Sequence, residues 1–274
     1  MNTITRFAVP LLLILGGVIG FAVVAQADHS WGNAAGDPYH WARTANPFTL
    51  KLGDNLTSTW DPYLATAAAD WSVSSVLDVS VVASGKYPKT CRPTAGRGEV
   101  CNAKYGANGW LGLAQIWISG IHITQGTVKL NDTYFNWATY NKPEWKNLVM
   151  CQEVGHLLGL DHQDENMGNA NLDTCMDYTN TPASNQHPNS HDYAMLEDIY
   201  AHLDSSTTLQ QSLASKPQAA SVESDDPREW GREIRRSADG RASLYERDFG
   251  NGQKVFTHVF WVTGDENSRF SRGR

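Results

Sequence analysis

The sequence VMCQEVGHLLGLDHQDE, residues 149–165, combines a helical repeat with side chains that can bind a metal. Gln152 and His156 are four residues apart, so on a helix both lie on one face. Gly159 can adopt the left-handed conformation that ends a helix, and the chain can then fold back. His162, three residues further on, returns to the same point. The stretch therefore predicts a helix ending in a tight turn that brings three donor side chains together.

This arrangement fits the chemistry of a catalytic zinc site. Zinc with three protein ligands keeps a fourth position for water and lowers the pKa of that water toward about 7. Glu153 follows Gln152 in the helix and can take the proton of the water as it attacks a carbonyl. The residues predict a Zn²⁺ ion bound by His156, His162 and Gln152, with Glu153 as general base. Gln152 would bind through its amide oxygen, a weaker donor than imidazole. The alternative is that Gln152 only forms a hydrogen bond and the metal is lost.

The segment 152–162 resembles the signature H-E-x-x-H-x-x-G-x-x-H of the metzincin zinc peptidases, with glutamine in place of the first histidine. Downstream, TCMDYTN resembles the Met-x-Tyr turn of the astacin and serralysin branches. The resemblance implies that Met176 lies beneath the metal. It also implies a catalytic role for Tyr178, which would help to stabilise the tetrahedral intermediate; alternatively, Tyr178 only anchors the turn.

The resemblance implies an α+β fold for residues 28–204, a metzincin-like catalytic domain. It would contain a twisted mixed β-sheet with an antiparallel edge strand and about three helices. Residues 117–123 would form the edge strand, along which an extended peptide or protein substrate binds by strand addition. The implied function is that of a secreted zinc-dependent endopeptidase. The alternative is a catalytically inactive, metzincin-like binding module. Calcium is plausible for the family, but no oxygen-rich loop has a recognisable spacing.

Local patterns predict the remaining elements. A helix capped by Ser58 or Thr59, with Pro62 in its first turn, precedes a strand at 77–84. Residues 86–109 are rich in Gly, Pro, Lys and Arg and predict a surface loop. The other expected elements are two strands hinged near Gly120, a helix at 143–159 and a helix at 189–204.

The composition changes after residue 204. Residues 205–226 are polar and lack periodicity, which predicts a linker. In residues 227–274, the runs SLYERDFG and KVFTHVFWV flank Asn251-Gly252, a strong hairpin signal. We expect a small C-terminal β appendage there, without an assigned role.

The N-terminal residues 1–27 predict an export signal. Arg6 precedes a long apolar run, and Ala25-Gln26-Ala27 offers small residues for cleavage. An uncleaved membrane anchor is the alternative. Removing Arg6 with this segment changes the formal charge from −7 to −8. The sequence therefore predicts a secreted protein that binds neither nucleic acid nor, after cleavage, the membrane.

The four cysteines, in an oxidising compartment, predict two disulfides. Three pairings are possible. A local bridge between Cys91 and Cys101 would close the loop CRPTAGRGEVC and leave Cys151 with Cys175. Buried free thiols are the alternative.

Three of the seven histidines outside the motif have a local context that can be interpreted. His187 and His191 have helical spacing, but Pro188 breaks a shared helix, so we expect a cap or surface role. His122 lies in a predicted strand, where packing is expected and substrate contact is the alternative.

Overall fold

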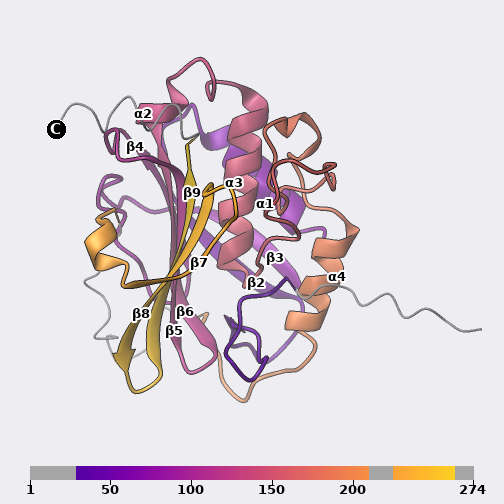
Figure 1. The fold of residues 1–274 in the computed structure, drawn as a ribbon. Coiled ribbons are helices and arrows are strands. Elements are labelled where there is room, and N and C mark those ends of the chain that lie inside the picture. The colour runs from indigo at the N-terminus through magenta and orange to yellow at the C-terminus, as the bar shows by residue number, and fades with distance from the viewer. Residues whose placement is uncertain (1–28, 210–224, 263–274) are drawn as a thin grey trace, which may run out of the picture.

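One large mixed sheet organises the protein (Figure 1). A computed structural model describes residues 29–209 and 225–262. The predicted signal segment 1–27 and most of the predicted linker 205–226 lie outside these residues. The strand order is β3-β2-β4-β6-β5-β9-β8-β7, and β1 pairs with β6. The sheet and its few helices agree with the expected mixed α and β class.

The bounds of the elements are as follows. The strands are β1 (His40–Trp41), β2 (Phe48–Asn55), β3 (Leu77–Ala83), β4 (Gly98–Ala103), β5 (Trp110–Ser119), β6 (His122–Asn131), β7 (Arg232–Arg236), β8 (Ala242–Gly250) and β9 (Gln253–Trp261). The helices are α1 (Asp61–Trp71), α2 (Asp132–Phe135), α3 (Pro143–Leu157) and α4 (Ser190–Ile199), with short 3₁₀ turns η1 (Pro182–Ser184) and η2 (Pro227–Glu229). Among the described residues, no helix is both long and apolar enough to span a membrane.

Most of the locally predicted elements are confirmed. The strand β3, the pair β5 and β6 around Gly120, and the helices α3 and α4 form where the patterns placed them. The predicted caps of α1 are wrong. Ser58 and Thr59 lie in a turn closed by the Trp60 N–H donating to the Thr57 carbonyl at 2.8 Å. The helix therefore begins only after this turn, at Asp61.

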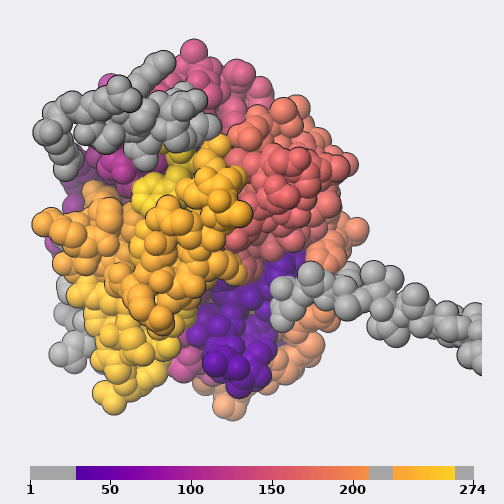
Figure 2. Space-filling view, viewed as in Figure 1, coloured from indigo at the N-terminus to yellow at the C-terminus, as the bar shows by residue number. Residues whose placement is uncertain are grey.

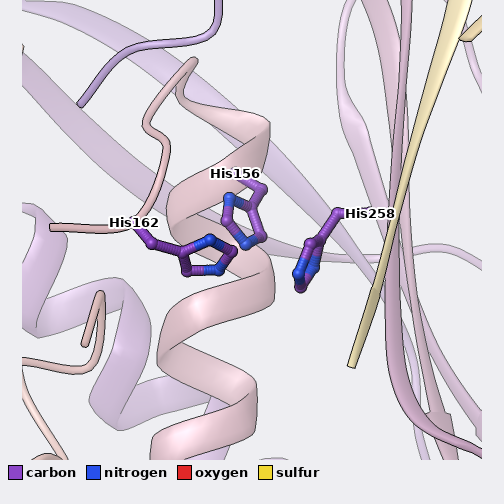
Figure 3. Close-up of side chains that lie close together, drawn as sticks. All are labelled: His156, His162 and His258. Carbon is purple, nitrogen blue, oxygen red and sulfur yellow. The ribbon is translucent and has the colours of Figure 1, made fainter. Parts of the chain in front are cut away.

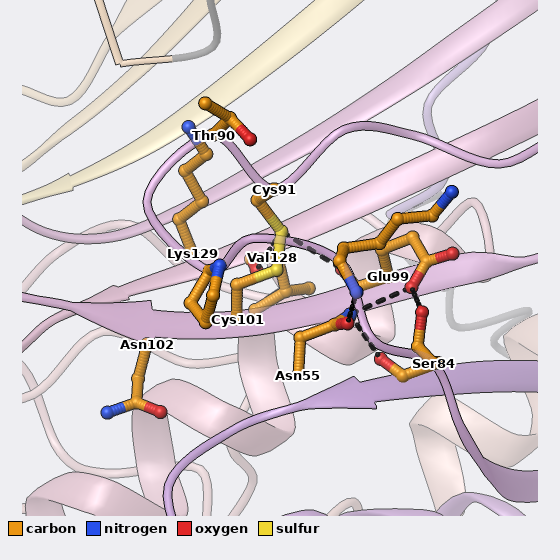
Figure 4. The surroundings of a disulfide bond; sticks show 12 residues. Asn55, Ser84, Thr90, Cys91, Glu99, Cys101, Asn102, Val128 and Lys129 are labelled. Carbon is orange, nitrogen blue, oxygen red and sulfur yellow. Dashed lines mark hydrogen bonds between the residues drawn. A yellow bond between two sulfur atoms is a disulfide. The ribbon is translucent and has the colours of Figure 1, made fainter.

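The predicted surface loop 86–109 is also wrong in part, because it contains β4. This strand lies between β2 and β6 and is parallel to both. Its charged residue, Glu99, is fully buried and accepts hydrogen bonds from neighbouring side chains (Figure 4). The donors are Asn55 at 2.8 Å, Ser84 at 2.7 Å, Thr94 at 2.5 Å and the Arg97 Nε at 2.8 Å. A paired charge allows a strand of polar composition to be buried.

Two disulfides form. Their pairing is the one expected if the nearby cysteines Cys91 and Cys101 form a local bridge. Cys91–Cys101 joins the loop before β4 to the strand itself (Figure 4). Cys151–Cys175 joins α3 to the segment that contains Met176. No cysteine is free.

Helix α3 packs closely on the sheet because glycines face it. A Cβ at Gly112 of β5 would lie 2.5 Å from the Val149 Cγ1 atom. A Cβ at Gly126 of β6 would lie 2.8 Å from a Leu157 methyl carbon. Both distances are too short for a side chain, so these positions set the height of the helix above the strands.

The C-terminal strands extend the main sheet instead of forming an appendage beside it. The hairpin prediction is confirmed: Asn251 and Gly252 connect β8 and β9 with φ of 52° and 73°. Strand β9 pairs antiparallel with β5, from Trp110 opposite Trp261 to Ser119 opposite Gln253. The prediction that residues 117–123 form a sheet edge is therefore wrong. An open edge presents unpaired backbone groups, and β9 pairs with those of β5.

Glu99 gives the fold a stability that depends on pH. Burial raises its pKa, but the hydrogen bonds from Thr94, Ser84, Asn55 and Arg97 outweigh burial, so the pKa lies below its ordinary value of 4.5. Stability from this charge is thus present above that value and is lost as pH falls through the folded pKa. We expect Glu99→Gln to destabilise the protein at pH 7 by about 3 kcal/mol, because Arg97 loses its buried partner.

Thermal unfolding between pH 7 and pH 3 measures this effect. The difference in Tm between the wild type and Glu99→Gln should shrink as the pH falls. A difference that stays constant over this range would contradict the assignment.

Candidate metal centre

The turn after α3 is built around Gly159. Its φ of 93° favours glycine, and a Cβ there would lie 2.2 Å from the Tyr39 carbonyl oxygen. The N-terminal segment crosses this turn, where the Trp31 N–H donates to the Gly159 carbonyl at 2.8 Å. The chain folds back as the sequence predicts, and His162 returns to His156.

Three histidines meet beside this turn: His156, His162 and His258 (Figure 3). One ligand nitrogen from each lies within 4.8 Å of the others. Their ring centroids are separated by 4.6 Å for His156 and His162, 4.2 Å for His156 and His258, and 4.7 Å for His162 and His258. The third histidine comes from β9, more than 90 residues beyond the motif.

The hydrogen bonds of His156 and His162 fix which nitrogens face inward. The His156 Nδ1 lies 2.9 Å from the Leu160 carbonyl oxygen, and the His162 Nδ1 lies 3.2 Å from a Glu165 carboxylate oxygen. Both partners are acceptors, so each Nδ1 carries the hydrogen and each Nε2 presents a lone pair. Neither buried Nε2 has a hydrogen-bond partner within residues 29–209 and 225–262. A cation satisfies such lone pairs, and an outer acceptor on Nδ1 is typical of metal-binding histidines.

His258 has the same kind of support. Its Nδ1 lies 3.0 Å from the Glu153 Oε2, and its Nε2 lies 2.8 Å from the Tyr178 hydroxyl. With the Nδ1–H donating to the carboxylate, Nε2 accepts from Tyr178 and can instead bind a metal. The second carboxylate oxygen of Glu153, Oε1, is buried without a partner in the described chain.

Burial sets the protonation states at this centre. It lowers the pKa of both His156 and His258 to about 3, and it lowers the pKa of His162 well below the ordinary value. All three imidazoles are therefore neutral at physiological pH, as metal binding requires. Burial raises the pKa of Glu153 to about 8. At that value the carboxyl is mostly protonated at pH 7, and a bound cation would favour its charged form, which can accept a proton.

Gln152 lies in α3, one turn before His156. Its side-chain Nε2 donates to the Cys175 carbonyl at 2.9 Å, which fixes the orientation of the amide. Its Oε1 is buried and finds no donor among the described residues. Zinc binding by Gln152 stays a prediction. The third imidazole beside His156 and His162 is that of His258.

Met176 packs against the underside of α3. A Cβ at Gly155 would lie 2.7 Å from the Met176 Sδ, so the sulfur rests on the bare backbone of the helix. The same turn carries Tyr178, whose ring centroid lies 4.5 Å from that of His162. The turn thus delivers both a packing residue and a hydroxyl group to the site.

The surrounding chain encloses the three histidines. Trp31 stacks on His156 with ring centroids 4.8 Å apart. Arg235 of β7 binds both oxygens of Asp161, at 2.6 and 2.5 Å, beside His162. In Figure 2 the C-terminal strands, in orange and yellow, form one continuous surface with the segment after α3. The centre is therefore closed by residues from both ends of the chain.

His258 could not be predicted as a ligand from a motif, because nothing near residue 258 resembles a metal-binding pattern. One local signal was present. In KVFTHVFWV, strand alternation places Phe256, His258 and Phe260 on one face. All three are buried, and Phe256 and Phe260 belong to the main core. A histidine on an otherwise apolar strand face needs a partner, which is a reason to suspect a ligand.

Comparisons with known proteins add a distant likeness. No family model and no curated protein matches the chain. Among solved structures, it is similar to high choriolytic enzyme 1, a hatching enzyme zinc-protease from Oryzias latipes (medaka fish). The identity is 9%, the TM-score is 0.32, and the match covers 60% of this chain and 94% of the other. A likeness at this level does not transfer a role to any residue here.

The geometry predicts which variant loses metal. His258→Ala removes an imidazole, so zinc affinity should fall by more than the roughly 10–100-fold typical of outer-shell changes. Gln152→Ala is the matched comparison and should leave affinity in the full chain nearly unchanged. Competition with a chromogenic chelator measures both. The opposite order of the two effects would show that Gln152, not His258, binds the metal.

Proposed function

We propose that the protein is a secreted zinc-dependent endopeptidase that its own C-terminal strand holds in a closed form. The observation that carries this proposal is the pair of buried, unpartnered Nε2 atoms of His156 and His162 beside the buried carboxylate of Glu153. Two neutral imidazoles alone would suit many metal proteins. The adjacent carboxylate, with one oxygen left over, adds a proton acceptor.

His156, His162 and His258 would hold the zinc ion in the closed form. In the open form, zinc held by His156 and His162 would supply a Lewis acid for the attack of water on a peptide carbonyl. In the closed form the Glu153 Oε2 orients His258; in the open form the carboxylate would be free to accept the proton of the water. The Tyr178 hydroxyl is a donor at the same centre and can stabilise negative charge that develops on the carbonyl oxygen.

Strand β9 explains why the form is closed. An extended peptide would add to the outer edge of β5, and β9 pairs with that edge over its whole length. His258 is 1% exposed, and Glu153 and His156 are fully buried. A substrate can therefore reach the centre only after β9 leaves β5, and His258 leaves with it.

Gln152 would replace His258 in the open form. It lies one turn before His156 on the same face of α3, and its Oε1, which has no hydrogen-bond partner among the described residues, has lone pairs available to a metal. The amide nitrogen stays bonded to the Cys175 carbonyl, so the side chain is already held in place. A site that receives its third imidazole from another strand does not need a histidine at position 152.

A second candidate is a non-catalytic module whose zinc is structural. The observation in its favour is the integration of β9: Phe256 and Phe260 lie in the main core, and Val259 packs on the other face with Trp110 and Leu113. In this case β9 would never leave the sheet. The two candidates differ in whether weakening β9 produces activity.

Val259→Ala weakens β9 without touching the metal centre. Val259 is fully buried in the closed form and becomes exposed when β9 leaves. The smaller side chain should lower the stability of the closed form by about 2 kcal/mol. The fraction of molecules in which β9 has left β5 should then rise roughly 30-fold. Hydrolysis of a labelled unfolded protein by the zinc-loaded full chain should rise by a similar factor. Ile234→Ala, at a 39% exposed position of β7, is the matched control and should leave the rate unchanged.

The Val259→Ala variant can also be used to distinguish the roles of Glu153 and Gln152. In the Val259→Ala chain, Glu153→Gln should lower kcat about 10²–10⁴-fold while zinc stays bound. Gln152→Ala in that background should instead release zinc from the open form. Zinc binding without any hydrolysis in all of these variants would rule out the peptidase and favour the structural module.

A further inference from the structure

A second group of histidines lies at another end of the sheet. His40 in β1 and His122 at the start of β6 are register partners, and His202 and Asp204 follow α4. His122 pairs with Ser119 of β5, whereas His258 pairs with Ala114. Five residues along a strand correspond to about 16 Å. This group is therefore separate from the centre described above.

The ligand atoms of this group have the spacing of a metal site. The His40 Nε2 lies 3.4 Å from the Asp204 Oδ1 and 3.2 Å from the His202 Nε2. The His202 Nε2 lies 3.8 Å from the same Oδ1. Zinc bonds of about 2.0–2.1 Å at tetrahedral angles place neighbouring ligand atoms about 3.3–3.4 Å apart. The three separations bracket that value.

Hydrogen bonds to neighbouring groups orient the His40 Nε2 and the Asp204 Oδ1 toward each other. The His40 Nδ1 lies 2.9 Å from the Pro38 carbonyl oxygen, so it carries the hydrogen and Nε2 presents a lone pair. Arg43 occupies the other oxygen of Asp204: its backbone N–H and its Nη1 donate to Oδ2 at 3.1 and 3.0 Å. The Asp204 Oδ1 is left for the group. His40 is fully buried, so its lone pair needs either a cation or a hydrogen, which the His202 Nε2 could donate from 3.2 Å.

We propose that His40, His202 and Asp204 bind a second, structural zinc ion. Imidazole nitrogens and one carboxylate oxygen are ligands that zinc accepts, and structural zinc sites have four ligands. The fourth ligand would be a water molecule, or His122 after its side chain turns toward the group: its Nε2 lies 3.1 Å from the Asp204 Oδ1, its side chain is one-third exposed, and only the other three residues have ligand atoms that are all close together.

Such an ion would brace three segments that are distant in sequence. The residue after His40, Trp41, donates its indole N–H to the Leu157 carbonyl at 2.7 Å. The Tyr200 hydroxyl, two residues before His202, donates to the Leu158 carbonyl at 3.0 Å. Both contacts reach the last turn of α3. The second ion would therefore hold the N-terminal strand and the end of α4 against the helix that carries His156.

Zinc content per chain tests the proposal. The full-length protein is dialysed against a weak chelator, and bound zinc is measured by mass spectrometry. The wild type should retain two equivalents, and His202→Ala should retain one. His202 is 49% exposed at its side chain, so its loss leaves the core intact. His187→Ala, at a 57% exposed histidine that also contacts a carboxylate, is the matched control and should retain two.

Two further measurements separate the sites. Removing zinc with a strong chelator should lower the Tm of His258→Ala, which keeps only the second ion, but should not lower that of the double variant His202→Ala/His258→Ala. If the first centre binds no metal, the wild type retains one equivalent that His202→Ala loses and His258→Ala keeps. Equal zinc content in the wild type and His202→Ala would overturn the proposal and show that hydrogen bonds alone hold the group.

Discussion

The pairing of β9 with β5 is the interaction on which the rest of the candidate metal centre depends. Without it, α3 and its turn supply two imidazoles, a carboxylate and an amide. With it, a third imidazole reaches the same point and the carboxylate acquires a partner. The backbone pairing that brings His258 in also covers the strand where a peptide would lie. In the proposed peptidase, completing the ligand set and blocking the substrate path would thus be one structural event.

The parts of the centre that could be predicted from sequence are those built by local geometry. His156 lies in the helix, Gly159 forces the turn, and His162 follows it after three residues, so short-range rules suffice. The hairpin at Asn251-Gly252 was equally local. The position of His258 against His156 depends on pairing between strands that are separated by the whole of α3 and α4, and no rule of local spacing reaches that far.

The remaining errors have a common cause. Strand β4 looked like a loop because glycine and charged residues suggest exposure, yet Glu99 is buried among donors that come from other segments. The group around Asp204 was equally hidden, since its members come from three distant segments. In each case the sequence shows a polar side chain, and only the folded chain shows what neutralises it.

The disulfide between Cys151 and Cys175 has a consequence for how the centre forms. Cys151 precedes Gln152, and the Cys175 carbonyl accepts the Gln152 amide, so the bridge fixes the helix and the Met176 turn on one another. A chain that is held this way loses less conformational freedom when it binds a metal. Thermodynamic linkage is reciprocal, so a bound ion would in turn make the bridge harder to reduce. Oxidation and metal loading would then reinforce each other, and the assembled centre would be most stable where both thiol oxidants and zinc are present.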